Sequence, residues 1–98
     1  MTTAGSGKEL DWRRRKLRFR SWHRGMREMD LILGRFADAL LDRLSEDEVA
    51  DFERLIEVPD RDVLAWITGE RAVPPDHDSG LFRKLRAYHL RNRDGVTP

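Results

Sequence analysis

The spacing of apolar residues between Met26 and Leu44 most constrains the fold of this chain. Apolar side chains recur there at intervals of three and four residues, at Met26, Met29, Leu33, Phe36, Leu40 and Leu44. This period places them along one face of an α-helix. Alternating β-branched residues, which would indicate a strand, occur nowhere over a useful length. The sequence therefore predicts an all-α protein.

Residues that begin or end helices divide the next part of the chain. Ser45 and Glu48 have the spacing of a capping box, which starts a further helix. Pro59 ends that helix because its ring clashes with a continuing turn. Asp60 is then expected to cap a short helix that ends at Gly69.

Two more helices are predicted near the ends of the chain. One covers Glu9 to His23, and the other starts at a cap formed by Asp76 or Ser79. The inner face of the latter consists of apolar and aromatic residues, which are Leu81, Phe82, Leu85 and Tyr88. The five helices with their short connections predict a small compact bundle.

The bundle is expected to form one domain over residues 9–93, with flexible tails at 1–8 and 94–98. A chain of 98 residues with 39% hydrophobic content supports one core and no deep enclosed active site. Gly34 lies inside a predicted helix, where glycine costs roughly 1 kcal/mol relative to alanine. Its presence there predicts that two helices cross closely at this point.

Composition and motifs exclude most catalytic and metal sites. The absence of cysteine rules out thiolate catalysis, disulfides and the usual zinc fingers. His23, His77 and His89 lack the spacing of metal ligands on one helix. Motifs for a catalytic nucleophile and for a phosphate-binding glycine loop are missing as well. We predict no catalytic residue, no metal and no stably bound cofactor.

The apolar runs, such as Leu31–Leu33, are too short to cross a bilayer. Residues 1–7 lack the basic start and the apolar stretch of a secretory signal. We therefore expect a soluble cytoplasmic protein that does not insert into a membrane directly. When free, it is expected to be a monomer.

Charge is segregated along the chain, although the net charge is only +1. Residues 1–27 carry nine Lys and Arg against two Asp and Glu, whereas residues 28–79 carry five against fifteen. Because like charges held together weaken a compact fold, this pattern indicates a partner. Arginines interleaved with Trp12, Phe19 and Trp22 could bind nucleic acid, but the acidic middle segment favours a protein. A plainer interpretation is that these arginines pair with acidic neighbours inside the bundle.

A cluster of charges surrounds a glycine between the first two predicted helices. It consists of Arg24, Gly25, Arg27, Glu28 and Asp30. In one interpretation it is a capped corner held by an ion pair. In the other it is a recognition surface, with Arg24 as a forked donor and Glu28 as an acceptor. Gly25 suits either a left-handed backbone or a close approach of another backbone, and the chemistry alone leaves both interpretations open.

This cluster resembles the hallmark of the FAD assembly factors of succinate dehydrogenase, the SdhE-type family. That hallmark is R-G-x-x-E followed by an acidic residue, matched here by Arg24, Gly25, Glu28 and Asp30. The resemblance continues through Leu-Ser-Glu-Asp-Glu at 44–48 and covers roughly residues 12–93. The arginine cluster at 13–15 is richer than the motif demands.

The resemblance implies a five-helix maturation factor and not an enzyme. Members bind the flavoprotein subunit of succinate dehydrogenase, and often of the related fumarate reductase, and promote covalent attachment of FAD to that subunit. The FAD then belongs to the partner and not to this chain. The predicted partner-binding residues are Arg24, Gly25, Glu28 and Asp30, surrounded by Arg27, Arg20 and Trp22. The alternatives are a basic helical nucleic-acid-binding module and an antitoxin-like regulatory protein.

Overall fold

The computed structural model describes the backbone of residues 2–96 and the side chains of residues 7–92, so that Met1 and residues 97–98 lie outside it. Within this part of the chain five α-helices and two short 3₁₀ turns follow one another without a strand, which confirms the all-α prediction. The helices are α1 (Thr2–Trp22), α2 (Arg27–Leu40), α3 (Glu46–Leu55), α4 (Asp60–Thr68) and α5 (Gly80–Val96).

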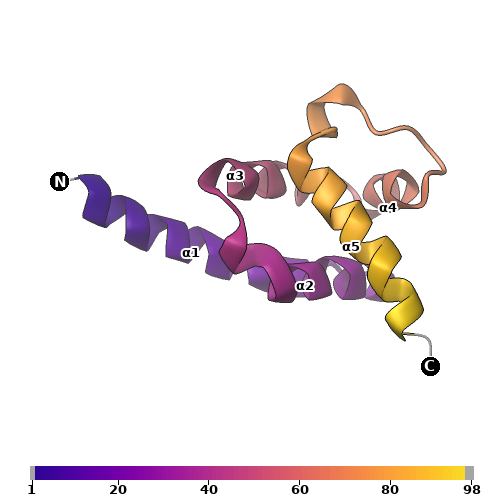
Figure 1. Ribbon diagram of the computed structural model, residues 1–98, viewed down its shortest axis with the longest axis horizontal. Coiled ribbons are helices and arrows are strands. Elements are labelled where there is room, and N and C mark those ends of the chain that lie inside the picture. The colour runs from indigo at the N-terminus through magenta and orange to yellow at the C-terminus, as the bar shows by residue number, and fades with distance from the viewer. Residues whose placement is uncertain (1, 97–98) are drawn as a thin grey trace.

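Helices α1 and α2 run side by side in opposite directions and are joined by residues 23–26 (Figure 1). Helix α3 packs against α1 and α5, and α5 also contacts α2. The first turns of α1 extend away from the other helices (Figure 1). Residues 23–26 therefore form a corner between α1 and α2 at one end of the bundle.

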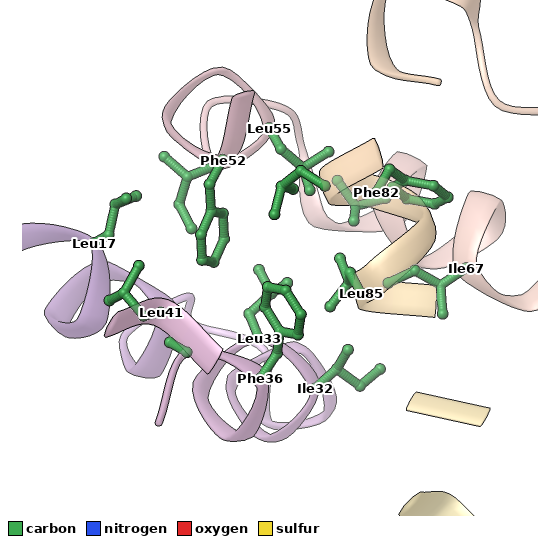
Figure 2. Close-up of a cluster of buried hydrophobic side chains, with 14 of the residues drawn as sticks. Leu17, Ile32, Leu33, Phe36, Leu41, Phe52, Leu55, Ile67, Phe82 and Leu85 are labelled. Atoms are coloured by element: carbon green, nitrogen blue, oxygen red, sulfur yellow. The ribbon is translucent and has the colours of Figure 1, made fainter. Parts of the chain in front are cut away.

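The core forms where the predicted apolar faces meet (Figure 2). Phe36 of α2 lies at its centre and packs edge-on against Phe52 of α3, with 5.7 Å between the ring centroids. Side chains from all five helices contribute, including Leu17, Leu33, Phe52, Ile67, Phe82 and Leu85. Burial of this shared apolar surface is the main force holding the short helices together.

Three local sequence signals are confirmed. The Ser45 hydroxyl accepts a hydrogen bond from the Glu48 amide at 3.1 Å, and the Glu48 carboxylate accepts one from the Ser45 amide at 2.9 Å. Gly69 ends α4 in a left-handed conformation with φ +85°. Of the two proposed caps for α5, Ser79 is the right one, since its hydroxyl accepts from the Phe82 amide at 3.1 Å.

The predicted close crossing at Gly34 is also confirmed. The indole ring of Trp22, at the end of α1, occupies the space that a side chain at position 34 would need. The Trp22 Nε1 group donates to Asp38 of α2 at 3.3 Å. Glycine suits this position because the Cβ of any larger residue would clash with the Trp22 ring and force it to move.

Several predicted boundaries were wrong. Helix α1 begins at Thr2 and not at Glu9, because a helix that is already nucleated can be extended through poor helix formers. The predicted helix 26–44 instead ends at Leu40 and is followed by a 3₁₀ turn over Leu41–Arg43, which is a common way to tighten a last helical turn. At the other end of the chain α5 continues to Val96, while the predicted flexibility of residues 1–8 and 94–98, of which Met1 and 97–98 lie outside the described residues, stays a prediction.

The prediction that Asp60 caps α4 was wrong. Pro59 occupies the N-cap position, and no side chain caps the helix there. The Asp60 carboxylate instead accepts a hydrogen bond from Arg24, which comes from a distant part of the chain. A long-range charge partner therefore took the place of the local contact expected from sequence.

Candidate functional site

The corner between α1 and α2 is built on Gly25. This residue has a left-handed backbone with φ +92°, which confirms the conformational reason for glycine. It is exposed, and no atom of the described chain lies within 4 Å of the position where a Cβ would be. A side chain added at this position would therefore point into open space.

Arg24 turns inward and clamps the corner onto the link between α3 and α4. Its Nε donates to Asp60 at 2.8 Å, and its Nη1 and Nη2 donate to the backbone carbonyls of Ile56 at 2.8 Å and Val58 at 3.2 Å. The two charged side chains of this pair are only 10% and 16% exposed. For Arg24 the structure matches the capped-corner interpretation, and its place on a partner-binding surface stays a prediction.

Asp30 holds the same corner from the other side. Its carboxylate accepts a hydrogen bond from the Arg24 amide at 2.6 Å, and its own amide donates to the Met26 carbonyl at 2.9 Å. Asp30 is half-buried. Together, Arg24 and Asp30 fix the backbone on both sides of Gly25, so that α2 starts from a rigid support.

Arg27 and Glu28 form the outward part of the corner. Both are exposed in the first turn of α2, and neither takes part in an ion pair among the side chains that the structure describes. A carboxylate is favoured in that turn by the helix dipole. The Glu28 carboxylate is therefore exposed to solvent, and its place on a partner-binding surface stays a prediction.

Trp22 and Arg20 have structural contacts of their own. Trp22 is half-buried against Gly34, as described above. Arg20 donates to Glu57 at 2.7 Å, and this hydrogen bond lowers the pKa of the Glu57 carboxyl. Both side chains are only half-buried, so their place on a partner-binding surface around the corner stays a prediction.

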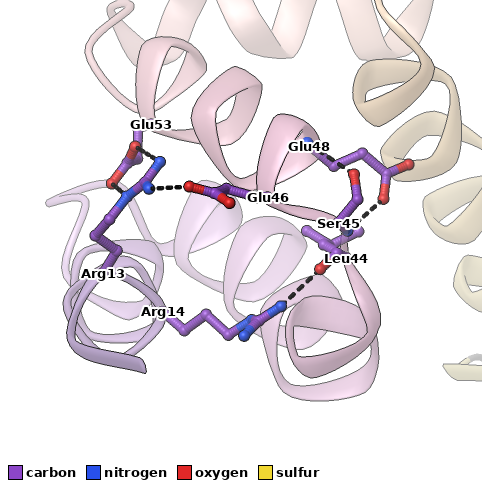
Figure 3. Close-up of polar contacts among 7 residues, drawn as sticks. All are labelled: Arg13, Arg14, Leu44, Ser45, Glu46, Glu48 and Glu53. Carbon is purple, nitrogen blue, oxygen red and sulfur yellow. Dashed lines mark hydrogen bonds and ion pairs between the residues drawn. The ribbon is translucent and has the colours of Figure 1, made fainter. Parts of the chain in front are cut away.

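The arginine cluster at 13–15 was expected from sequence either to bind a partner or to pair with acidic neighbours, and the structure gives two of its members partners within the bundle (Figure 3). Arg13 forms a double hydrogen bond to Glu53 of α3 at 2.8 and 3.0 Å, which raises the pKa of the guanidinium. Arg14 donates to the carbonyls of Leu41 and Leu44, at 3.2 and 2.7 Å. The cluster therefore joins α1 to α3 and to the 3₁₀ turn that follows α2.

These contacts show that several arginines of α1 bind groups within the bundle. Arg18 also pairs with Asp38 at 3.3 Å, as Arg20 does with Glu57. The interpretation in which the arginines pair with acidic neighbours is confirmed for these residues. On the outer face of α1, Arg15 and Lys16 remain exposed between Trp12 and Phe19.

A groove that the sequence did not predict lies between α2 and α5 and begins at Glu28. Its volume is about 190 Å³. The lining residues are Glu28, Leu31, Ile32, Arg35, Tyr88, His89 and Asn92. The sequence signal that could have revealed it is Leu31, an apolar residue beside the predicted core face and not on it.

No cluster of three potential metal ligands occurs among the described residues. Two of the histidines stack on aromatic rings, His23 on Phe19 and His77 on Trp66, with 4.0 and 5.4 Å between the ring centroids. In the same part of the chain, the helices are all too short or too polar to cross a membrane.

The fold and this corner define a small helical domain that presents a rigid, glycine-centred, charged surface. The chain belongs to the family described as flavinator of succinate dehydrogenase, whose model matches residues 15–89. The matched segment contains the entire corner.

Named relatives agree with this family. The chain is 34% identical over 73 residues to the FAD assembly factor SdhE of Acetobacter pasteurianus, a match that covers 74% of this chain and 67% of that protein. It is 36% identical over 84 residues to succinate dehydrogenase assembly factor 2 of Dictyostelium discoideum, covering 86% of this chain. That match spans only 59% of the Dictyostelium protein, and a match to Drosophila yakuba assembly factor 2-A spans 55% of it. No solved structure matches the chain.

Proposed function

We propose that this chain is a maturation factor that binds the flavoprotein subunit of succinate dehydrogenase and promotes covalent attachment of FAD to it. The observation that carries this proposal is the family match over residues 15–89, because it includes an exposed Gly25 and Glu28 on a rigid corner. The Acetobacter relative is named as an FAD assembly factor, and the Dictyostelium relative as an assembly factor of succinate dehydrogenase.

In this proposal the chain works by preorganisation and makes no bond itself. Gly25, Arg27 and Glu28 contact the partner, while Arg24 and Asp30 hold the backbone that presents them. Binding selects a conformer of the flavoprotein subunit in which its histidine and the flavin ring approach attack geometry. A rigid corner suits this role because little conformational entropy is lost when it binds.

The flavin stays on the partner, and the chain holds no cofactor of its own. Complementary charge between the two proteins would speed their encounter and fix their orientation. Fumarate reductase as a second client, a monomeric free state and a cytoplasmic location remain predictions made from sequence.

Reconstitution tests the proposal directly. The purified flavoprotein subunit without covalent flavin is incubated with FAD, with and without this chain, and then denatured and separated on a gel. We expect the fluorescence of covalently bound flavin to rise clearly above the level without the chain. An equal flavin signal in both reactions, with no complex detected on mixing, would contradict the proposal.

The nucleic-acid alternative is tested on the same sample. Arg13, Arg18 and Arg20 of α1 are each paired with a carboxylate within the chain, so fewer cations of this helix are left for phosphate contacts. We expect no retention of RNA or DNA at low salt, where binding through phosphate contacts is strongest. Retention that falls steeply with salt would favour the alternative.

A further inference from the structure

The groove between α2 and α5 has an apolar centre, and one of its sides is held in place by contact with the core. Leu31 and Ile32 of α2 face Tyr88 of α5 across it. The Tyr88 ring packs edge-on against the core residue Phe36, with 6.0 Å between the ring centroids. Asn92 donates to the Tyr88 carbonyl at 2.8 Å, so the next turn of α5 is fixed as well. The groove is thus a preformed feature of the bundle.

Opposite charges stand at the two ends of this groove. Glu28 and Arg35 lie seven residues apart on α2, which is two helical turns or about 10 Å along the axis. Both are exposed, and neither belongs to an ion pair among the described side chains. An occupant is therefore offered a carboxylate at one end, apolar contact in the middle and a guanidinium at the other end.

The size of the groove limits what can enter. A volume of about 190 Å³ exceeds the roughly 150 Å³ that suffices for benzene in a protein cavity. One aromatic ring or one large aliphatic side chain fills that space, whereas a nucleotide or a flavin would extend beyond it. The groove is suited to a single apolar residue of another protein.

We propose that this groove receives one large apolar side chain of the flavoprotein subunit, from a segment with a basic residue on the Glu28 side and an acidic residue on the Arg35 side. The proposal rests on the proposed function, because Glu28 belongs to both the corner and the groove. One partner can therefore cover both surfaces without a gap. The groove adds the apolar anchor that an interface of charges alone would lack.

The decisive variant is Leu31→Glu, which places a charge in the centre of the groove. Leu31 is only half-buried and lies outside the hydrophobic core, so the bundle is expected to remain folded. The matched control is Leu90→Glu, on a residue of α5 that is 44% exposed and does not line the groove. Affinity for the purified flavoprotein subunit is measured by calorimetry, and folding by circular dichroism.

We expect Leu31→Glu to weaken binding by about tenfold or more, since a charge in an anchor pocket must be desolvated. Leu90→Glu is expected to bind as the wild type does. Arg35→Glu, which changes only an exposed charge, should weaken binding severalfold, and the loss should shrink at high salt.

Other outcomes overturn the proposal in distinguishable ways. If the wild type binds the subunit and Leu31→Glu and Arg35→Glu bind equally well, the groove is not part of the interface while the proposed function stands. If the wild type does not bind at all, the proposed function fails and the inference fails with it. If sedimentation shows that Leu31→Glu abolishes self-association of the wild type and leaves subunit binding intact, the occupant is a second copy of this chain.

Discussion

Arg24 and Glu28 lie four residues apart in one short motif, yet the structure surrounds them in opposite ways. Arg24 is 10% exposed and uses its guanidinium to bind Asp60 and two backbone carbonyls. Glu28 is exposed and forms no ion pair among the described residues. The comparison teaches that one motif combines a residue that holds a surface with a residue that presents it. Variants at the two positions should therefore fail for different reasons.

The largest effect is expected from Arg24→Ala. The substitution leaves the Asp60 carboxylate and the carbonyls of Ile56 and Val58 without their donor in a largely buried place. We expect the free energy of unfolding to fall by about 2–4 kcal/mol, as when one partner of a buried ion pair is removed. Urea denaturation followed by circular dichroism measures this.

The control for Arg24 is Arg27→Ala, three residues along the chain. Arg27 is exposed and has no ion-pair partner among the described residues, so its removal should change stability by no more than about 0.5 kcal/mol. Equal stability of the two variants would show that the Arg24 clamp contributes little to the free energy of unfolding. Arg24 would then not be the residue that holds the corner.

Gly25→Arg should leave a folded bundle that no longer binds the partner. The left-handed backbone costs a non-glycine residue about 1–2 kcal/mol, but the added side chain meets no atom of the chain within 4 Å. It would therefore block an approaching protein. Gly69→Arg is the matched control, because Gly69 has nearly the same φ, +85°, and equally open surroundings at the end of α4. A pull-down in which both variants bind the flavoprotein subunit alike would contradict a role for the corner.

Glu28→Ala should leave stability within about 0.5 kcal/mol of the wild type while lowering the yield of covalent flavin on the partner. Asp47→Ala is the control, since Asp47 is an exposed carboxylate in the first turn of α3, as Glu28 is in that of α2. Flavin fluorescence of the denatured partner on a gel reports the yield. A wild-type yield with Glu28→Ala would remove Glu28 from the functional surface.

The smallest effect concerns pH and lies away from the corner. Hydrogen bonds from Lys84 and from the Ser45 amide lower the pKa of the Glu48 carboxyl below its usual 4.5. A lowered pKa in the folded state stabilises the fold above the unfolded pKa, and this contribution disappears as pH falls through the folded value. The free energy of unfolding should therefore decline below about pH 4.5. Glu48→Gln should make that decline shallower in denaturation curves between pH 3 and pH 7, and an unchanged slope would assign the acid sensitivity to other groups.

Features that depend on neighbours within one helical turn were predictable from sequence. The capping box at Ser45 and Glu48 and the end of α4 at Gly69 both follow from local geometry. The apolar period of α2 likewise predicted which of its residues enter the core. These features need no knowledge of what lies opposite in space.

Features that depend on distant partners were predicted poorly or not at all. Asp60 has the chemistry of a helix cap, yet it binds Arg24, which is 36 positions away in sequence. For Arg13 and Arg14 the sequence offered pairing with acidic neighbours without naming one, and their targets are Glu53 and the carbonyls of Leu41 and Leu44. A guanidinium can bind many acceptors, so composition cannot select among them.

Five helices, their core-facing sides, the glycine corner and the resemblance to a flavinylation factor family could all be predicted from the order of residues alone. The packing of the helices was needed to show that Arg24 is an internal clamp, that Glu28 faces outward, and that a groove joins Glu28 to Arg35. The reason is physical, since helix formation follows from contacts between residues three and four apart. Burial and charge pairing depend instead on which surfaces the packing of five helices brings together.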